Sequence, residues 1–126
     1  MSTLNLVQTN ESNGKARVIL EDLEKKLGSV PNTYKAMANQ PEFLEALLKL
    51  DEATFNGGKI PRKYKELIAI AVSAVNGCQY CLSAHKMLGK KAGLTEEEVA
   101  EALAIAATMS AYNNFNKALG LEIDLK

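Results

Sequence analysis

Apolar residues recur at helical spacing in every long segment of this chain, and glycine, proline and asparagine interrupt the pattern. No run shows the alternation of period two, bounded by turn residues, that is typical of a strand. The sequence therefore predicts an all-α fold, a bundle of about six helices. The expected helices span approximately residues 14–27, 31–38, 41–55, 61–76, 78–91 and 95–119.

Residues with strong positional preferences mark several of these helix ends. Asn13 is placed as the N-cap of the first helix, and Gly28 is placed to end it. Thr95 and Glu98 have the spacing of a capping box at the start of the last helix. We expect Gly77 to form the turn between the fourth and fifth helices.

Two segments are expected to supply most of the core. The stretch "PRKYKELIAIAVSAVN" at 61–76 is polar in its first turn and apolar nearly all round afterwards, which predicts a central buried helix. The methionines and aromatic residues of the last helix, among them Met109 and Phe115, are predicted to lie in the core. So much apolar, alanine-rich helix surface in a small chain also predicts a homo-oligomer.

Length and charge limit the classes of function. A chain of 126 residues is expected to form a single domain over residues 1–126. Fifteen basic residues balance fifteen acidic ones, so we expect no nucleic-acid partner. The amino terminus lacks the pattern of a secretory signal, and the most apolar stretch, 67–75, is much shorter than the roughly 20 residues of a membrane span. The expected location is the cytoplasm, without membrane association.

The segment "NGCQYCLSAH" at 76–85 contains both cysteines and the single histidine of the chain. Three interpretations compete: a redox dithiol, a metal site, or two small buried hydrophobic residues. A structural zinc site normally has four ligands, and the chain has no further cysteine or histidine. We therefore expect no metal, and the CxxC spacing at a helix start favours the dithiol.

Helical geometry aligns the three reactive side chains. Cys78 falls in the first turn of its helix, Cys81 one turn later, and His85 four residues beyond, with Leu88 and Ala92 continuing the same inward-facing row. Free amide groups and the positive end of the helix dipole favour a thiolate at this end of the helix. An imidazole titrates near neutrality and can accept the proton of Cys81. Burial opposes both effects.

A carboxylate is expected beside this row. If the helices before and after Gly77 form a tight antiparallel hairpin, residues at equal distances from the turn face each other. Glu66 then lies level with His85 to Leu88 and is placed to orient the imidazole, as carboxylates often do. The alternative is a carboxylate in a helix first turn, stabilised by the dipole.

The stretch "IPRKYKELIAIAVSAVNGCQYCLSAH" at 60–85 resembles the core signature of the carboxymuconolactone decarboxylase superfamily, in its alkylhydroperoxidase D-like branch. The resemblance covers roughly residues 41 to 115 and is most specific from Pro61 to His85, including the glutamate, the Asn-Gly turn and the CxxCxxxH motif. It implies an alkylhydroperoxidase D-like helical bundle with the CxxC at the N-terminus of a central helix. It also implies assembly into a trimer or hexamer.

The same resemblance implies a thiol peroxidase that reduces organic hydroperoxides. Cys81 would be the peroxidatic thiolate, His85 its base and Glu66 the relay partner. Cys78 would be the resolving thiol that closes a Cys78–Cys81 disulfide. A dithiol or a lipoylated protein would then reduce the pair by thiol–disulfide exchange, without metal, flavin or haem.

One position departs from the lipoyl-linked members of the branch, which carry a histidine between the two cysteines. Tyr80 stands there in this chain. A phenol can donate a hydrogen bond but is not a base near neutrality, so Tyr80 is either auxiliary to the reaction or a packing aromatic residue. Two other functions remain open, a carboxymuconolactone decarboxylase-type lyase and a non-enzymatic redox switch. The lyase branch typically lacks the CxxC pair.

Overall fold

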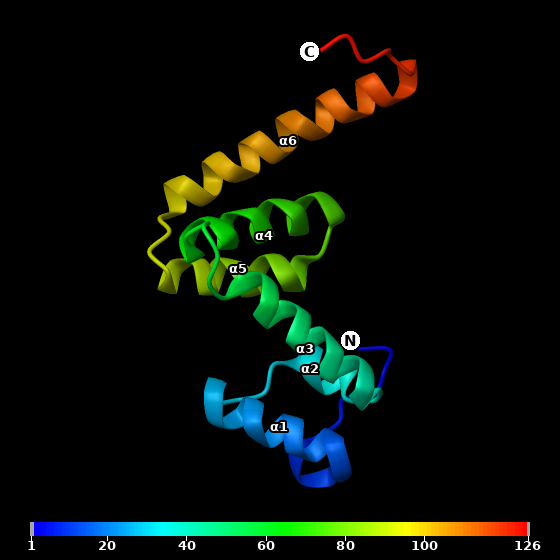
Figure 1. Cartoon of the computed structure of the whole chain (residues 1–126), viewed down its shortest axis with the longest axis vertical. Coiled ribbons are helices and arrows are strands. Elements are labelled where there is room, and N and C mark those ends of the chain that lie inside the picture. Colours follow the sequence, from blue (N-terminus) through cyan, green and yellow to red (C-terminus); the bar gives the residue numbers. More distant parts are fainter. Residues whose placement is uncertain (1, 126) are drawn as a thin grey trace. The chain divides into compact units, whose positions relative to one another are not determined.

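The computed structural model describes residues 2–125, and it contains α-helices but no strand within that range (Figure 1). A short 3-10 helix precedes six α-helices, which confirms the predicted all-α fold. The CxxC pair stands at the start of α5, as the sequence predicts. The elements are η1 (Thr9–Glu11), α1 (Gly14–Leu27), α2 (Asn32–Met37), α3 (Pro41–Phe55), α4 (Arg62–Asn76), α5 (Gln79–Lys91) and α6 (Glu96–Leu119).

The predicted helix ends are largely confirmed. Gly28 and Gly77 follow α1 and α4 in left-handed backbone conformations, with φ of 84° and 76°. Glycine adopts this conformation without the steric penalty that a Cβ would bring. Thr95 and Glu98 form the capping box at the start of α6, with each side chain accepting a backbone N–H of the other residue. Asn13 occupies the N-cap position of α1, but its side chain makes no capping hydrogen bond.

The described chain divides into two compact units, with the boundary after Asn56. The N-terminal unit contains η1 and α1 to α3, and Leu20 of α1 and Leu44 of α3 are fully buried in its core. The segment before η1 is tied to α2 by a backbone hydrogen bond from Val7 N–H to the Lys35 carbonyl, 3.0 Å. Each unit has its own core, and the single domain over residues 1–126 stays a prediction.

The C-terminal unit is built around α4, which packs against both α5 and α6. Its core contains Ile70 of α4, Leu94 of the α5–α6 loop and Val99 of α6. An ion pair between Lys63 and Glu98, 3.0 Å long, joins α4 to α6. This unit contains every residue that the sequence proposes for the reaction.

The prediction that α4 is a central buried helix holds for one face of the helix and is wrong for the other. One face of the helix is buried, through Glu66 and Ile70, whereas Ile68, Val72 and Val75 are 52%, 53% and 60% exposed. The helices packed against α4 in its unit are α5 and α6, and they cover the face that carries the glutamate. The opposite face is apolar and open to solvent in the isolated chain.

The prediction that methionine and aromatic residues of α6 lie in the core is also wrong. Met109 is 49% exposed and Phe115 is 67% exposed, and Ala106 is the last buried residue of the helix. The reason is length, since α6 has 24 residues whereas α4 has 15. The C-terminal part of α6 therefore lies beyond the helix that buries its first half. Among residues 2–125, no helix has both the length and the hydropathy needed to cross a bilayer.

Candidate active site

The site is formed by the hairpin of α4 and α5. Gly77 makes the turn, and the N–H of Cys78 donates to the carbonyl of Ser73 at 2.9 Å, which closes the end of α4. The two helices pack along each other (Figure 1). The tight antiparallel hairpin predicted about Gly77 is therefore present.

The two cysteines lie within one turn at the start of α5. Cys78 is the N-cap residue, and its sulfur accepts a hydrogen bond from the N–H of Cys81 at 3.1 Å. The two sulfurs are joined as a disulfide, with the Cα atoms 5.3 Å apart. Both residues are partly buried. The side chains thus lie on one side of the helix, where the sequence predicts them.

The imidazole of His85 is held by a buried carboxylate. Its Nδ1 lies 2.9 Å from Oε2 of Glu66, which is fully buried, whereas the His85 side chain is 23% exposed. This contact confirms the hairpin register predicted from the distances to Gly77. An ionised carboxylate only accepts hydrogen bonds, so Nδ1 carries the proton and Nε2 of the neutral ring keeps its lone pair. A histidine held in this way presents a basic nitrogen one helical turn from Cys81.

A second partner of the carboxylate was missed by the sequence analysis. Nε of Arg62, at the start of α4, lies 3.0 Å from Oε1 of Glu66. The arginine side chain is 47% exposed, so it connects a fully buried carboxylate to the surface. The signal in the sequence is the spacing, since Arg62 stands four residues before Glu66 on one helix. That spacing is common on exposed helix faces and does not by itself indicate a site.

Gly89 is the other residue that sequence reasoning did not identify. It lies one turn after His85 and is buried in the last turn of α5. A Cβ built at Gly89 would be 3.6 Å from Cβ of Glu66 and 2.5 Å from Cδ1 of Leu94. The absence of a side chain therefore leaves room for the Leu94 side chain against α5, whereas the distance to Glu66 is an ordinary van der Waals contact.

Tyr80 lies near the start of α5 with its side chain 47% exposed. It is the second residue of the helix, between the two cysteines. Its auxiliary role stays a prediction. Within residues 2–125 no three side chains of histidine, cysteine, aspartate or glutamate are grouped so as to hold a metal ion.

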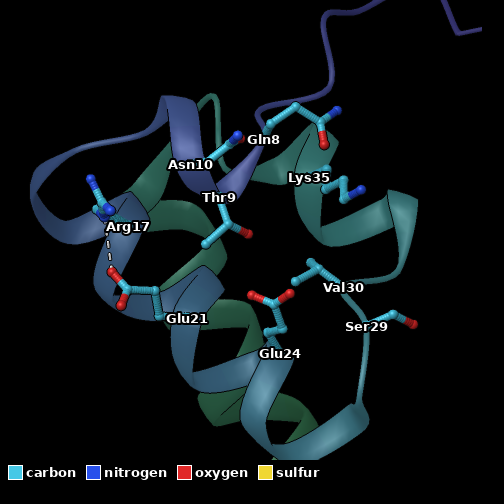
Figure 2. Close-up of a pocket in the computed structure, with 9 residues that line it drawn as sticks. All are labelled: Gln8, Thr9, Asn10, Arg17, Glu21, Glu24, Ser29, Val30 and Lys35. Carbon is cyan, nitrogen blue, oxygen red and sulfur yellow. Dashed lines mark hydrogen bonds and ion pairs between the residues drawn. The ribbon is translucent and has the colours of Figure 1, made fainter.

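A separate open cavity of about 560 Å³ lies in the N-terminal unit (Figure 2). Its lining is polar and of mixed charge, and it includes Glu24, Lys35 and an ion pair of 3.0 Å between Arg17 and Glu21. The residues around it come from η1, α1 and the segment from Ser29 to Lys35. It contains none of the residues predicted for the reaction.

An all-helical chain in which a CxxC pair opens a helix, followed by a histidine bonded to a buried glutamate, defines a class of dithiol proteins. Comparison with known families is consistent with that class. The model of the carboxymuconolactone decarboxylase family matches residues 41–121. The chain belongs to this family.

Individual relatives extend the comparison. The chain is 38% identical over 85 residues to uncharacterized protein 4 in the cox locus of Paracoccus denitrificans. The aligned region covers 64% of this chain and 77% of that protein. It is 51% identical over 45 residues to the alkyl hydroperoxide reductase AhpD of Mycobacteroides abscessus, 36% of this chain and 26% of that one. The chain thus spans about a quarter of the length of this reductase.

Among solved structures, the crystal structure of the alkylhydroperoxidase AhpD core from Rhodospirillum rubrum is similar to the whole chain. The TM-score is 0.87 at 27% identity, covering 98% of this chain and 95% of that one. The protein is therefore an AhpD-like member of the family with a CxxC pair, and the fold matches that of an AhpD core.

Proposed function

We propose that this protein is a thiol peroxidase that reduces organic hydroperoxides through Cys78 and Cys81. The observation that carries the proposal is the 2.9 Å contact between His85 Nδ1 and the buried carboxylate of Glu66, one turn beyond a CxxC pair. It provides a thiol, a base and a group that orients the base. The similarity to an alkylhydroperoxidase AhpD core supports the same reaction.

The cycle starts from the two reduced thiols. Nε2 of His85 accepts the proton of Cys81, and the thiolate attacks the terminal oxygen of the hydroperoxide. The O–O bond breaks, the sulfur becomes a sulfenic acid, and the leaving alkoxide takes the proton from the imidazolium to form an alcohol. The thiol of Cys78 then attacks the sulfenic sulfur, so that an S–S bond forms and water leaves. Two thiols thereby supply the two electrons that reduce one hydroperoxide.

An external dithiol completes the cycle by thiol–disulfide exchange, and the lipoyl group of a lipoylated protein is our candidate. Because the cycle needs reduced cysteines, we place it in the cytoplasm, where reductants maintain thiols. The phenol of Tyr80 is proposed as an auxiliary hydrogen-bond donor beside the reacting sulfur. Tyr80→Phe is expected to slow the oxidation without abolishing it.

The test is stopped-flow oxidation of the reduced protein by cumene hydroperoxide, followed by mass spectrometry. The wild type is expected to give the Cys78–Cys81 disulfide, Cys78→Ser to stop at the sulfenic acid, and Cys81→Ser not to react. His85→Ala is expected to lose roughly 10²–10⁴ in rate, the usual contribution of a general base. Ser83→Ala, an exposed change on the same helix, is the matched control and is expected to react like the wild type.

Oxidation of the wild type no faster than that of a short CxxC peptide would refute the peroxidase. Retention of the wild-type oxidation rate in Cys81→Ser would refute Cys81 as the peroxidatic thiol, whereas lactone decarboxylation that Cys81→Ser leaves unchanged would favour a lyase. Rapid oxidation without turnover in the presence of any dithiol would favour the redox switch.

We also propose that the protein is a homo-oligomer, a trimer or a hexamer. The support is an exposed apolar stripe along α4 at helical spacing, formed by Tyr64, Ile68, Val72 and Val75. Contiguous apolar surface of this kind commonly marks an interface. Light scattering is expected to give three or six times the chain mass of 13.7 kDa, and a mass that stays at 13.7 kDa at all concentrations would contradict the proposal.

A further inference from the structure

The carboxylate of Glu66 is shared between two partners. Oε2 accepts from Nδ1 of His85 at 2.9 Å, and Oε1 accepts from Nε of Arg62 at 3.0 Å. The side chain of Glu66 is fully buried. A buried carboxylate without a charged partner takes up a proton rather than remain ionised. Of the two partners, only the arginine is positively charged at every pH of interest.

We propose that Arg62 is a positioning residue that keeps Glu66 ionised and thereby sets the pH range in which His85 can accept a proton. This role rests on the proposed peroxidase function. Arg62 acts through Glu66 rather than on the substrate. Its 47% exposure lets the guanidinium remain hydrated while one N–H reaches the buried oxygen.

Counting charges gives the direction of the effect. With Arg62 present, the neutral histidine, the carboxylate and the arginine sum to zero, and one added proton makes the cluster positive. Without the arginine charge, the Glu66–His85 pair is negative, and the same proton makes it neutral. The pair therefore takes up its first proton at a higher pH, whichever of the two groups holds that proton.

The surrounding groups do not reverse this direction. On α5 itself, Cys78 and Cys81 are uncharged in the disulfide. On α6, Glu98 is paired with Lys63 of α4 at 3.0 Å, and the variants change neither residue. A full charge near a titrating group commonly moves the midpoint of its titration by about 1–3 pH units. Because Arg62 is half exposed and solvent screens its charge, we expect a shift at the lower end of this range, about one pH unit.

The test uses the single histidine of the chain, whose ring signals in an NMR titration need no assignment among several. In the oxidised protein, Arg62→Gln and Arg62→Met are both expected to raise the midpoint of the histidine titration by about one pH unit. Arg62→Lys restores a charge and is expected to titrate within a few tenths of a unit of the wild type.

The matched control is Arg17→Gln. Arg17 and Glu21 form the same contact, Nε to Oε1 at 3.0 Å with four-residue spacing, but both side chains are half exposed and lie in the N-terminal unit. This variant is expected to leave the midpoint unchanged. An unchanged midpoint in both Arg62→Gln and Arg62→Met, or an equal shift in Arg17→Gln, would overturn the proposal.

The kinetic arm separates a charge effect from damage to the fold. The rate of oxidation by cumene hydroperoxide is expected to fall in Arg62→Gln by up to about tenfold at acidic pH and to return to the wild-type value as the pH rises. A rate that stays low at every pH would overturn the proposal. If the wild type does not reduce hydroperoxides, the peroxidase fails, whereas the titration of the disulfide form still tests the role of Arg62.

Discussion

A methyl group added at Gly89 tests whether the close packing of Leu94 against α5 requires a glycine at this position. A Cβ at this position would lie 2.5 Å from Cδ1 and 3.4 Å from Cγ of Leu94. Leu94 is 7% exposed and packs in the core cluster with Ile70 and Val99, so its side chain has little space to rotate. Its backbone N–H also donates to the carbonyl of Gly89 at 2.9 Å, which holds the two residues together.

Two opposing effects determine the size of the change in the free energy of unfolding. Alanine is favoured over glycine inside a helix by about 0.5–1 kcal/mol. Forcing an extra methyl group into a packed core costs about 1–3 kcal/mol. Gly89→Ala is therefore expected to destabilise the protein by about 1 kcal/mol. The contact to Glu66 Cβ at 3.6 Å is an ordinary van der Waals distance and does not add to this cost.

Urea unfolding, followed by circular dichroism, measures the effect in two backgrounds. Leu94→Ala removes both atoms that a Cβ at Gly89 would approach most closely, at its own cost of about 2–5 kcal/mol. In that background, Gly89→Ala is expected to stabilise by about 0.5–1 kcal/mol, the helix preference alone. The sign of the substitution thus reverses between the two backgrounds.

A stabilising Gly89→Ala in the wild-type background would refute the reasoning, because it would mean that Leu94 moves aside without cost. A destabilising effect of equal size in both backgrounds would also refute it, because the clash would then lie elsewhere. The comparison holds when the slopes of free energy against urea agree among the four proteins.

Three further predictions concern the core, the site and a helix cap. Leu44→Ala removes a fully buried side chain and is expected to cost about 2–5 kcal/mol in urea unfolding, whereas Leu50→Ala, 58% exposed on the same helix, is expected to cost less than about 0.5 kcal/mol. Glu66→Gln keeps the size of the side chain but removes its charge, so stopped-flow oxidation of the reduced protein by cumene hydroperoxide is expected to slow at least about tenfold, and an unchanged rate would exclude the relay. The backbone N–H of Thr95, and next a lysine ammonium, hold the pKa of Glu98 below its ordinary value of 4.5. The stability from this carboxylate is therefore complete above that value and is lost as the pH falls through the lowered pKa, so Glu98→Gln is expected to flatten the loss of stability between about pH 5 and 3, and an equally steep loss would contradict the assignment.

Local signals explain why much of the fold is predictable from the sequence. Gly28 and the Thr95–Glu98 box mark helix ends through their own backbone conformations and hydrogen bonds, which depend little on the rest of the chain. The Glu66–His85 contact is predictable because a turn of two residues, Gly77 and Cys78, leaves the hairpin with a single register. These features can be predicted from the order of the residues alone.

Features that depend on packing are not predictable in this way. The ion pair between Arg62 and Glu66 points to a functional site only because the Glu66 side chain is fully buried. The sequence alone is equally consistent with a solvent-exposed Glu66 in the first turn of its helix. The need for glycine at position 89 becomes clear only from the packing of the Leu94 side chain against it. The apolar face of α4 was wrongly assigned to the core because hydropathy does not distinguish an apolar surface that the chain buries from one that it leaves exposed.

The chemistry proposed here depends on one hairpin, from Arg62 to Gly89. The left-handed conformation of Gly77 sets which residues of α4 and α5 are level, and Gly89 leaves room for Leu94 to pack against α5 one turn beyond His85. If the register moved by one residue, a helical step of about 100° would turn Glu66 away from the imidazole. The relative positions of a thiol pair, a base and a buried carboxylate therefore follow from the geometry of one turn, and in our proposal the charge of Arg62 keeps the carboxylate ionised.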